Sequence, residues 1–368
     1  MKRPVKPDIS VFSCFPDTHS ASHRPAGFDW RTVELWIENK REIDDPFMTI
    51  QELQKHANVA SYHTRWANGA CGTYSRLISH AMSLHRSQFR VFSFSVAVFE
   101  ESARLLRWGR SGVIYTEPFK WADGRLFEFF WRFNHLSAVD RGYDTTVSLA
   151  DDGEAELALP KLRTYLKFEN VRKEHLHRIL VWDDCSSDDG PRRYITPNAK
   201  WATEALIGRA TFGYITFDVE RGNLVYLNDF WRLDHPEIQK EGDVYRELLE
   251  AEVRNIAKLG RASDVRSTID DGQVRASVVV QRTRTQDSFE SFMVPGLAVK
   301  QYVHYQLILE TVGMPLNRFK STRQLCEVIR DAVIGEGGSH ASLYKLNMLI
   351  AHTNAYNNSQ ILHRDVSA

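Results

Sequence analysis

The sequence is poor in cysteine and has no long hydrophobic run. Its four cysteines, at positions 14, 71, 185 and 326, show no paired spacing, so we interpret them as free thiols in a reducing compartment. The most apolar stretch, residues 91–99, is too short to cross a bilayer as a helix. No apolar segment follows the charged N-terminal residues, so they form no signal peptide. We therefore expect an intracellular protein without a membrane partner.

An excess of charge of one sign is also absent. Lysine plus arginine and aspartate plus glutamate number 47 each, which does not favour a nucleic-acid partner. The 14 histidines form no ligand pattern with the cysteines, so we predict no metal-ligating residues. At 368 residues the chain has room for two domains and a substantial core.

Periodic segments fill the second half of the chain. Residues 224–232 and 304–313 are strand-like, and the second run ends in a glycine. A helical run follows the first of these strands, with apolar residues at 244, 248, 249, 253 and 256. Ser321 and Gln324 have the spacing of a capping box, which predicts a further helix with one apolar face.

A glycine-rich segment precedes the strand at 224–232. Gly208 and Gly213 lie in it, with Ala210 between them. Glycine at such positions lets backbone N–H groups approach a phosphate, and the Cβ of Ala210 crowds that approach without forbidding it. A glycine-rich hairpin without a ligand explains this segment equally well.

Five short segments occur in a fixed order along the chain. They are Gly208-Arg209-Ala210-Thr211, Asn228-Asp229-Phe230-Trp231-Arg232, Lys240-Glu241-Gly242-Asp243-Val244-Tyr245, Val312-Gly313-Met314-Pro315-Leu316 and His363-Arg364-Asp365-Val366-Ser367. Together they resemble the fungal-type protein kinase family, and stretches of the N-terminal half, such as residues 30–40 and 107–113, extend the resemblance. The family typically has glycine in place of Ala210 and lysine in place of Asn228.

The resemblance implies transfer of the γ-phosphoryl group of ATP to a Ser or Thr hydroxyl of a protein, with Mg²⁺ as a second cofactor. Asp365 would be the base, and His363 and Arg364 would build its loop. Asn228 stands where a lysine holds the phosphates, and a neutral amide supplies no positive charge. The other residues implied to surround the nucleotide are Gly208, Ala210, Gly213, the helix acid Glu241 with Glu247 as its alternative, and the hinge residues Leu309, Glu310 and Val312.

The architecture that we expect is a mixture of α/β and α+β. An N-terminal α/β domain would span residues 1–175, a connecting segment 176–200, and a protein-kinase-like small lobe with the start of the large lobe 201–368. The polar run 183–191 in the connecting segment would be a surface loop.

The kinase-like part has gaps in its chemistry. The magnesium-binding Asn implied five positions after Asp365 would fall beyond residue 368, so we interpret the chain as truncated within the catalytic loop. Together with Asn228 and Ala210, this predicts that the 368-residue chain lacks kinase activity. A non-catalytic pseudokinase or scaffold that binds a protein partner is the alternative.

The N-terminal part contains a second pattern that could carry chemistry. Pro7-Asp8, followed by a strand that ends in Glu38-Asn39-Lys40, is similar to the metal-binding pattern of restriction-endonuclease-like folds. Strand alternation places Glu38 and Lys40 on one face. An active nuclease, a degenerate nuclease-like scaffold and an unrelated α/β domain all remain open. Because the acid set is incomplete, we expect no cleavage of DNA or RNA.

An interruption follows the helix that begins near Ser321. The segment from Gly335 to Leu349 starts with three glycines within four residues, which cost a helix on the order of 3 kcal/mol relative to alanine. Removing it restores the family pattern across the join. We therefore interpret residues 335–349 as an unspliced intron translated in frame, and a natural loop insertion is the alternative.

Overall fold

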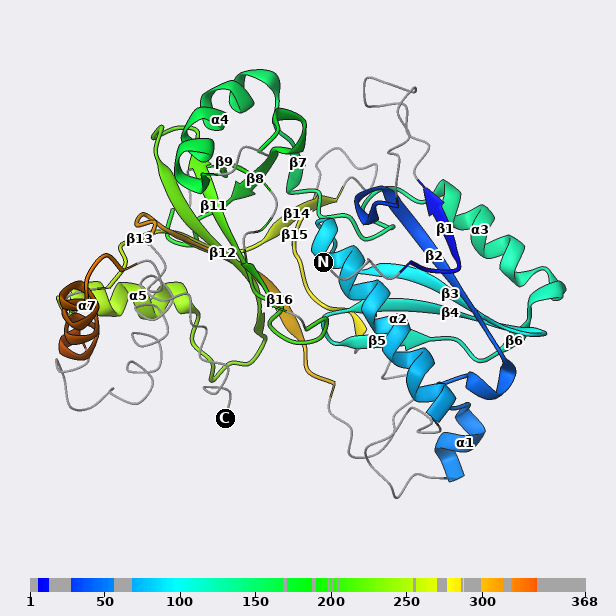
Figure 1. Ribbon diagram of the computed structural model, residues 1–368. Helices are drawn as coiled ribbons and strands as arrows, with labels where there is room; N and C mark the ends of the chain where they lie inside the picture. Colours follow the sequence, from blue (N-terminus) through cyan, green and yellow to red (C-terminus); the bar gives the residue numbers. More distant parts are fainter. Residues whose placement is uncertain are drawn as a thin grey trace. The chain divides into compact units, whose positions relative to one another are not determined.

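The computed structural model describes residues 6–12, 28–55, 68–167, 171–186, 190–197, 199, 201–203, 205–253, 256–269, 277–285, 287, 299–313 and 319–335. The chain forms two compact units that interleave along the sequence (Figure 1). Unit 1 comprises residues 1–145, 202–210 and 267–303, and unit 2 comprises residues 146–201, 211–266 and 304–368. The structure is mixed α/β, as the sequence predicts.

Unit 1 is built on a six-stranded sheet with the order β1-β2-β3-β4-β5, in which β6 pairs with β4. Strands β2 and β3 are parallel, so the chain must cross over between them, and helix α2 makes this crossing. The bounds are β1 Ile9–Phe12, β2 Val33–Lys40, β3 Ser93–Phe99, β4 Ser102–Gly109, β5 Gly112–Tyr115, β6 Phe119–Lys120, α1 Ile50–Lys55, α2 Asn68–Ser87 and α3 Arg125–His135. Three 3₁₀ turns span Trp30–Thr32, Glu42–Asp44 and Trp121–Asp123, and β14 (Arg266–Ile269) pairs with β15 (Ser277–Val280) in a separate sheet.

Alternating side chains of this sheet are buried against two different helices. Trp36 and Leu106 pack with Leu77 of α2, whereas Leu35 and Val96 pack with Phe133 of α3. Because neighbouring residues of a strand point to opposite faces, α2 and α3 cover opposite faces of the sheet. Figure 1 shows α2 crossing the strands of this sheet.

Unit 2 is built on an eight-stranded sheet with the order β13-β16-β12-β11-β9-β8-β7, in which β10 pairs with β11. The bounds of the strands are β7 Val147–Leu149, β8 His177–Val181, β9 Arg192–Thr196, β10 Trp201–Ala202, β11 Phe212–Asp218, β12 Leu224–Leu233, β13 Leu259–Asp264 and β16 Tyr302–Leu309. The helices are α4 Asp152–Leu166, α5 Glu241–Glu250 and α7 Thr322–Gly335, with a 3₁₀ turn at Lys173–His175.

Helices α4 and α5 cover one face of this sheet, which we call the inner face. Ile215 and Tyr226 are paired across β11 and β12, so they share a face, and both belong to the cluster that contains Ala158 of α4. Tyr305 of β16 and Tyr245 of α5 belong to the same cluster. Figure 1 shows α4 near β9 and β11, and α5 beside β13. One continuous core therefore joins both helices to the sheet.

The strands predicted at 224–232 and 304–313 are confirmed as β12 and β16. The predicted helix after Ser321 is confirmed as α7, whose Gln324 N–H donates to Ser321 Oγ at 3.2 Å. The helical run predicted to include residues 253 and 256 is too long, because α5 ends at Glu250. The N–H of Ala251 donates to the Glu247 carbonyl and completes the last turn. Glu252, with a φ of 52°, then turns the chain away from the helix.

Candidate functional sites

The predicted phosphate-binding strand presents Asn228 on the inner face of unit 2. Asn228 pairs with Gly213 of β11, two residues along the strand from Tyr226. Its Oδ1 is buried and accepts no hydrogen bond within the part of the chain that the structure describes. Arg232 lies on the same face, but its guanidinium donates to both oxygens of Asp264, at 2.7 and 3.0 Å. The position implied to hold phosphates therefore carries a neutral side chain.

The predicted loop residues Gly208 and Ala210 lie in unit 1. Both have positive φ, 95° and 41° respectively, a region that favours glycine. The N–H of Gly208 donates to the Arg110 carbonyl at 2.8 Å, and Ala210 is buried. An alanine in this conformation costs roughly 1–2 kcal/mol, which gives a backbone reason for the glycine that the family typically has there.

The predicted hinge follows β16. Leu309 is buried in the inner-face core, and the N–H of Glu310 donates to the Lys258 carbonyl at 2.9 Å. The Glu310 carboxylate contacts Arg221 and lies 2.7 Å from Lys258 Nζ. Partial burial alone raises the pKa of Glu310, but the hydrogen bonds from Lys258 and Arg221 bring it below its ordinary value.

Helix α4 also contacts the hinge. The Tyr165 hydroxyl donates to the Gly313 carbonyl at 2.7 Å, and Val312 packs against the core to which α4 belongs. Backbone groups of the segment implied to bind adenine are thus used by the chain itself. This contact could not be predicted from local pattern, because α4 lies about 150 residues before the hinge and its pattern is that of any amphipathic helix.

Asp229 and Trp231 of β12 point to the face opposite Asn228 and contact β16. The Asp229 carboxylate lies 2.7 Å from His304 Nε2 and accepts from Gln306 Nε2 at 3.0 Å. The indole of Trp231 stacks on the His304 ring, with 4.8 Å between ring centroids. These contacts explain the Asp and Trp of the strand motif as structural residues.

The Lys240-Glu241-Gly242 segment is the centre of an ion-pair network that sequence reasoning missed. Lys240 Nζ lies 2.7 Å from Asp184 and 2.9 Å from Asp264. The Asp184 carboxylate also pairs with Arg266. In the predicted surface loop at 183–191 the chain does turn at Asp184 and Cys185 is exposed, but the carboxylates of Asp183 and Asp184 are half-buried partners of cations. Predicting this network from the sequence would require knowing which acidic and basic residues on separate elements pair with each other.

The two glutamates proposed as partners of the strand lysine differ in their surroundings. Glu241 is half-buried in the first turn of α5, on the side that carries Tyr245 and Leu248. Glu247 is exposed, and its Oε1 accepts from Gln239 Nε2 at 2.6 Å. The remaining predicted residues, His363, Arg364 and Asp365, lie outside the described residues, as does the segment 336–349.

In unit 1 the structure brings Asp8, Glu38 and Lys40 together. Lys40 Nζ lies 3.1 Å from Asp8 Oδ2, 2.6 Å from Glu38 Oε1 and 2.8 Å from the Asn39 carbonyl oxygen. Three oxygens therefore surround one cation. Glu38 is buried, and its Oε2 lies 3.2 Å from His80 Nε2.

Both carboxyl groups of this cluster are held ionised. Burial alone raises the pKa of Glu38, but hydrogen bonds with His80 and Lys40 lower it below its ordinary value. Burial also raises the pKa of Asp8, but hydrogen bonds from the Asn39 N–H and the Lys40 ammonium bring it below its ordinary value. At neutral pH the cluster thus offers two carboxylates to a cation.

None of the described helices is long and apolar enough to cross a membrane. Within the same residues, no group of three or more His, Cys, Asp or Glu side chains could hold a metal ion.

A family model described as fungal protein kinase matches residues 38–368, which is more than half of the chain. The chain therefore belongs to the fungal protein kinase family. No curated protein and no solved structure matches it.

Proposed function

We propose that this chain belongs to a family whose chemistry is transfer of the γ-phosphoryl group of ATP to Ser or Thr hydroxyls of proteins, and that the 368-residue chain does not itself perform the transfer. ATP and Mg²⁺ are the cofactors that this chemistry requires. The observation that carries the proposal is the position of Asn228, whose neutral side chain lies on the inner face beside Gly213.

The missing charge affects catalysis directly. Phosphoryl transfer is accelerated mainly by positioning and by neutralising charge on the phosphates, and a strand lysine paired with a helix glutamate contributes to both. Removing one comparable electrostatic contact typically costs on the order of 3 kcal/mol, or about a hundredfold in rate. The cation on the same face of β12, Arg232, is held by Asp264 and does not replace it.

The test is a phosphotransfer assay with γ-labelled ATP, Mg²⁺ and a generic acceptor protein. We expect no transfer by the unaltered protein and no rise in its melting temperature with ATP. Asn228→Lys should introduce an ATP-dependent rise, whereas Asn223→Lys, a control in the adjoining turn, should not. Transfer by the unaltered chain that disappears in Asp365→Asn would contradict the proposal.

If no variant recovers nucleotide binding, we propose instead that the chain is a non-catalytic scaffold that binds a protein. This role is supported by the same inner face, where α4 packs on the sheet and Tyr165 holds the Gly313 carbonyl. Failure of Asn228→Lys to bind ATP, with its fold retained, would favour this role over a kinase that lost one residue.

A second candidate function belongs to unit 1 and rests on the surroundings of Lys40. Two carboxylates and one carbonyl oxygen are hard ligands of the type that Mg²⁺ and Mn²⁺ prefer, and the ammonium now lies among them. Asp8, Glu38 and the Asn39 carbonyl would hold such an ion, which would supply Lewis acidity toward a phosphate ester. This favours a nuclease-like scaffold, and we still expect no cleavage of plasmid DNA.

Manganese titration followed by electron paramagnetic resonance tests this second candidate. Lys40→Met removes the ammonium, while the Arg76 guanidinium stays 3.5 Å from Glu38 Oε1. This variant should bind Mn²⁺ more tightly than the unaltered protein, and Mn²⁺ should restore the stability that the substitution costs. Asp8→Asn should abolish the binding, whereas Asp123→Asn, which removes an arginine-paired carboxylate elsewhere in unit 1, should not. Equal binding by Asp8→Asn and Asp123→Asn would overturn this candidate.

A further inference from the structure

Unit 1 contains a cavity of about 830 Å³ whose walls all belong to that unit. It lies on the face of the sheet opposite α2, because Phe94 and Leu105 line it and belong to the cluster that packs with α3. Apolar side chains of the sheet and Phe129 of α3 form one part of the wall. Residues 279–284 form another part, which brings Arg284 to the same cavity.

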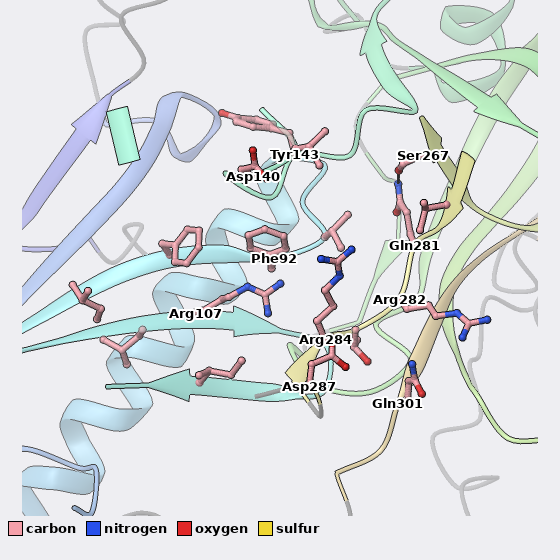
Figure 2. A pocket seen from close by; sticks show the side chains of 18 of the residues that line it. Phe92, Arg107, Asp140, Tyr143, Ser267, Gln281, Arg282, Arg284, Asp287 and Gln301 are labelled. Atoms are coloured by element: carbon pink, nitrogen blue, oxygen red, sulfur yellow. Dashed lines mark hydrogen bonds between the residues drawn. The ribbon is translucent and has the colours of Figure 1, made fainter. Parts of the chain in front are cut away.

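Two arginines project into this cavity. Figure 2 shows Arg107 beside Phe92, and Arg284 reaching the same space from the neighbouring segment. The guanidinium carbon of Arg107 lies 3.9 Å from the centre of the Phe92 ring, which holds the side chain in place by a cation–π contact. Among the residues that the structure describes, no carboxylate lies within ion-pair distance of either guanidinium.

Buried arginines of the same unit are paired, whereas Arg107, which is half-buried, and Arg284, which is exposed, are not paired with a carboxylate of the described residues. Arg104 Nε donates to Asp45 at 2.8 Å, and Arg90 donates to Glu34 at 3.2 Å. Burying a guanidinium without a partner is costly, so a folded protein normally supplies one from its own chain. Arg107 is half-buried and has none of this kind within the described residues.

The two cations also repel each other. Burial, and then the charge of Arg284, lower the pKa of Arg107 to about 10, while the charge of Asp287 raises it. Arg107 still carries its full charge at neutral pH. Asp140, the other acid of the cavity wall, accepts a hydrogen bond from the Ser137 hydroxyl. Within the described residues neither guanidinium thus pairs with a carboxylate, and both side chains line the cavity (Figure 2).

We propose that this cavity binds a small phosphate monoester whose phosphate lies between Arg107 and Arg284 and whose apolar or aromatic body lies against Phe94, Leu105 and Phe129. Two guanidinium forks match the charge and the several acceptor oxygens of a phosphate dianion better than those of a single carboxylate. The volume is in the range of sites for small organic ligands. The residues that line the cavity include none from the inner face of unit 2 and none from the Lys40 cluster.

Isothermal titration of the full 368-residue protein with phenyl phosphate tests the proposal. We expect saturable binding that weakens with added salt, and that falls about tenfold or more in Arg107→Met and in Arg284→Met. Arg125→Met is the matched control, because Arg125 also lies over a phenylalanine ring but outside the cavity. Binding unchanged in Arg107→Met and Arg284→Met, or absent from the unaltered protein, would overturn the proposal.

Two further measurements keep the result clear. Benzoate should bind at least about tenfold more weakly than phenyl phosphate, and equal binding would overturn the choice of a phosphate. Without ligand, Arg107→Met should leave the melting temperature unchanged or raised, whereas Arg104→Met should lower it, since only Arg104 has a carboxylate partner. A loss in Arg107→Met as large as that in Arg104→Met would show that Arg107 is a structural residue and would also overturn the proposal.

Discussion

Gly242 lies at the first turn of α5, where the helix comes closest to the sheet of unit 2. A Cβ built there would stand 2.4 Å from the Cβ of Ala262 and 2.6 Å from the hydroxyl of Tyr305. The Gly242 N–H donates to that hydroxyl at 3.1 Å. The glycine of the Lys-Glu-Gly segment is therefore required by packing, independently of any ligand.

Gly242→Ala should destabilise the protein by on the order of 1–3 kcal/mol, because neither contact can relax without moving the backbone of β13 or β16. The matched control is Gly72→Ala in α2, where nothing lies within 4 Å of the added Cβ. There the substitution should stabilise by about 1 kcal/mol through helix propensity. Urea denaturation followed by tryptophan fluorescence measures both, and a gain in stability for Gly242→Ala would disprove the packing argument.

Asp264 joins Arg232 of β12 to Lys240 before α5. Burial alone raises its pKa, but hydrogen bonds from Arg232 and Lys240 lower it below the ordinary value of 3.8. Because the folded-state pKa is lowered, the stabilisation is complete above 3.8 and is lost as the pH falls through the folded-state pKa.

Asp264→Asn should therefore cost on the order of 3 kcal/mol at pH 7 and less below pH 3.8. Its acid-unfolding curve should be flatter than that of the unaltered protein. Asp140→Asn, which removes an exposed carboxylate, serves as control. Acid-unfolding curves of equal slope for Asp264→Asn and the unaltered protein would contradict this role of Asp264.

Among the elements of unit 2, α4 both covers the inner face and contacts the hinge. Asp151 and Glu154 form a capping box at its start, and its buried side chains lie against β9 and β11 on the inner face. Ala158 and Leu162 are fully buried, whereas Leu157 is exposed. The helix is thus held by packing along one side.

Leu162→Ala should destabilise the protein by about 2–5 kcal/mol, because it opens a cavity in the core that joins α4 to the sheet. Leu157→Ala on the same helix should change stability by no more than about 0.5 kcal/mol. Thermal unfolding by circular dichroism distinguishes the two. Similar losses for both variants would mean that α4 is not held through its inner side.

Local patterns identified β12, β16, α7 and the strand that ends at Lys40, because each has strong periodicity or a cap of its own. Spacing also suggested that Glu38 and Lys40 share a face, and the 2.6 Å contact between them confirms it. The sequence could not show the pairing of Lys240 with Asp184 or of Tyr165 with Gly313. Such contacts join elements far apart in the chain, and no local pattern specifies them.

At the scale of the whole molecule, each compact unit is assembled from three separate stretches of sequence. Leu206 is buried in the core of unit 1 beside Trp36 and Trp108, although residues on either side of its stretch belong to unit 2. The Arg110 guanidinium donates to the Leu206 carbonyl at 3.2 Å. The first core is therefore incomplete without residues from the second half of the chain.

A fragment of residues 1–175 should consequently fail to unfold cooperatively, since it lacks Leu206 and the stretch 267–303. In the full chain, Leu206→Ala should cost about 2–5 kcal/mol. Intrinsic fluorescence of the fragment during urea titration provides the measurement. A sharp transition in the fragment, with the stability of the full chain, would show that unit 1 folds from contiguous sequence.

The hydrogen bond from Tyr165 to Gly313 has a consequence for ligand affinity. A nucleotide that needed the Gly313 carbonyl could bind only those molecules in which Tyr165 of α4 has left it. Its apparent dissociation constant would then be the intrinsic one divided by the population of that open form. If one molecule in about a hundred were open, a site with micromolar intrinsic affinity would register as about 100 µM, and a loosened α4 would restore affinity without any change to a residue that touches the nucleotide.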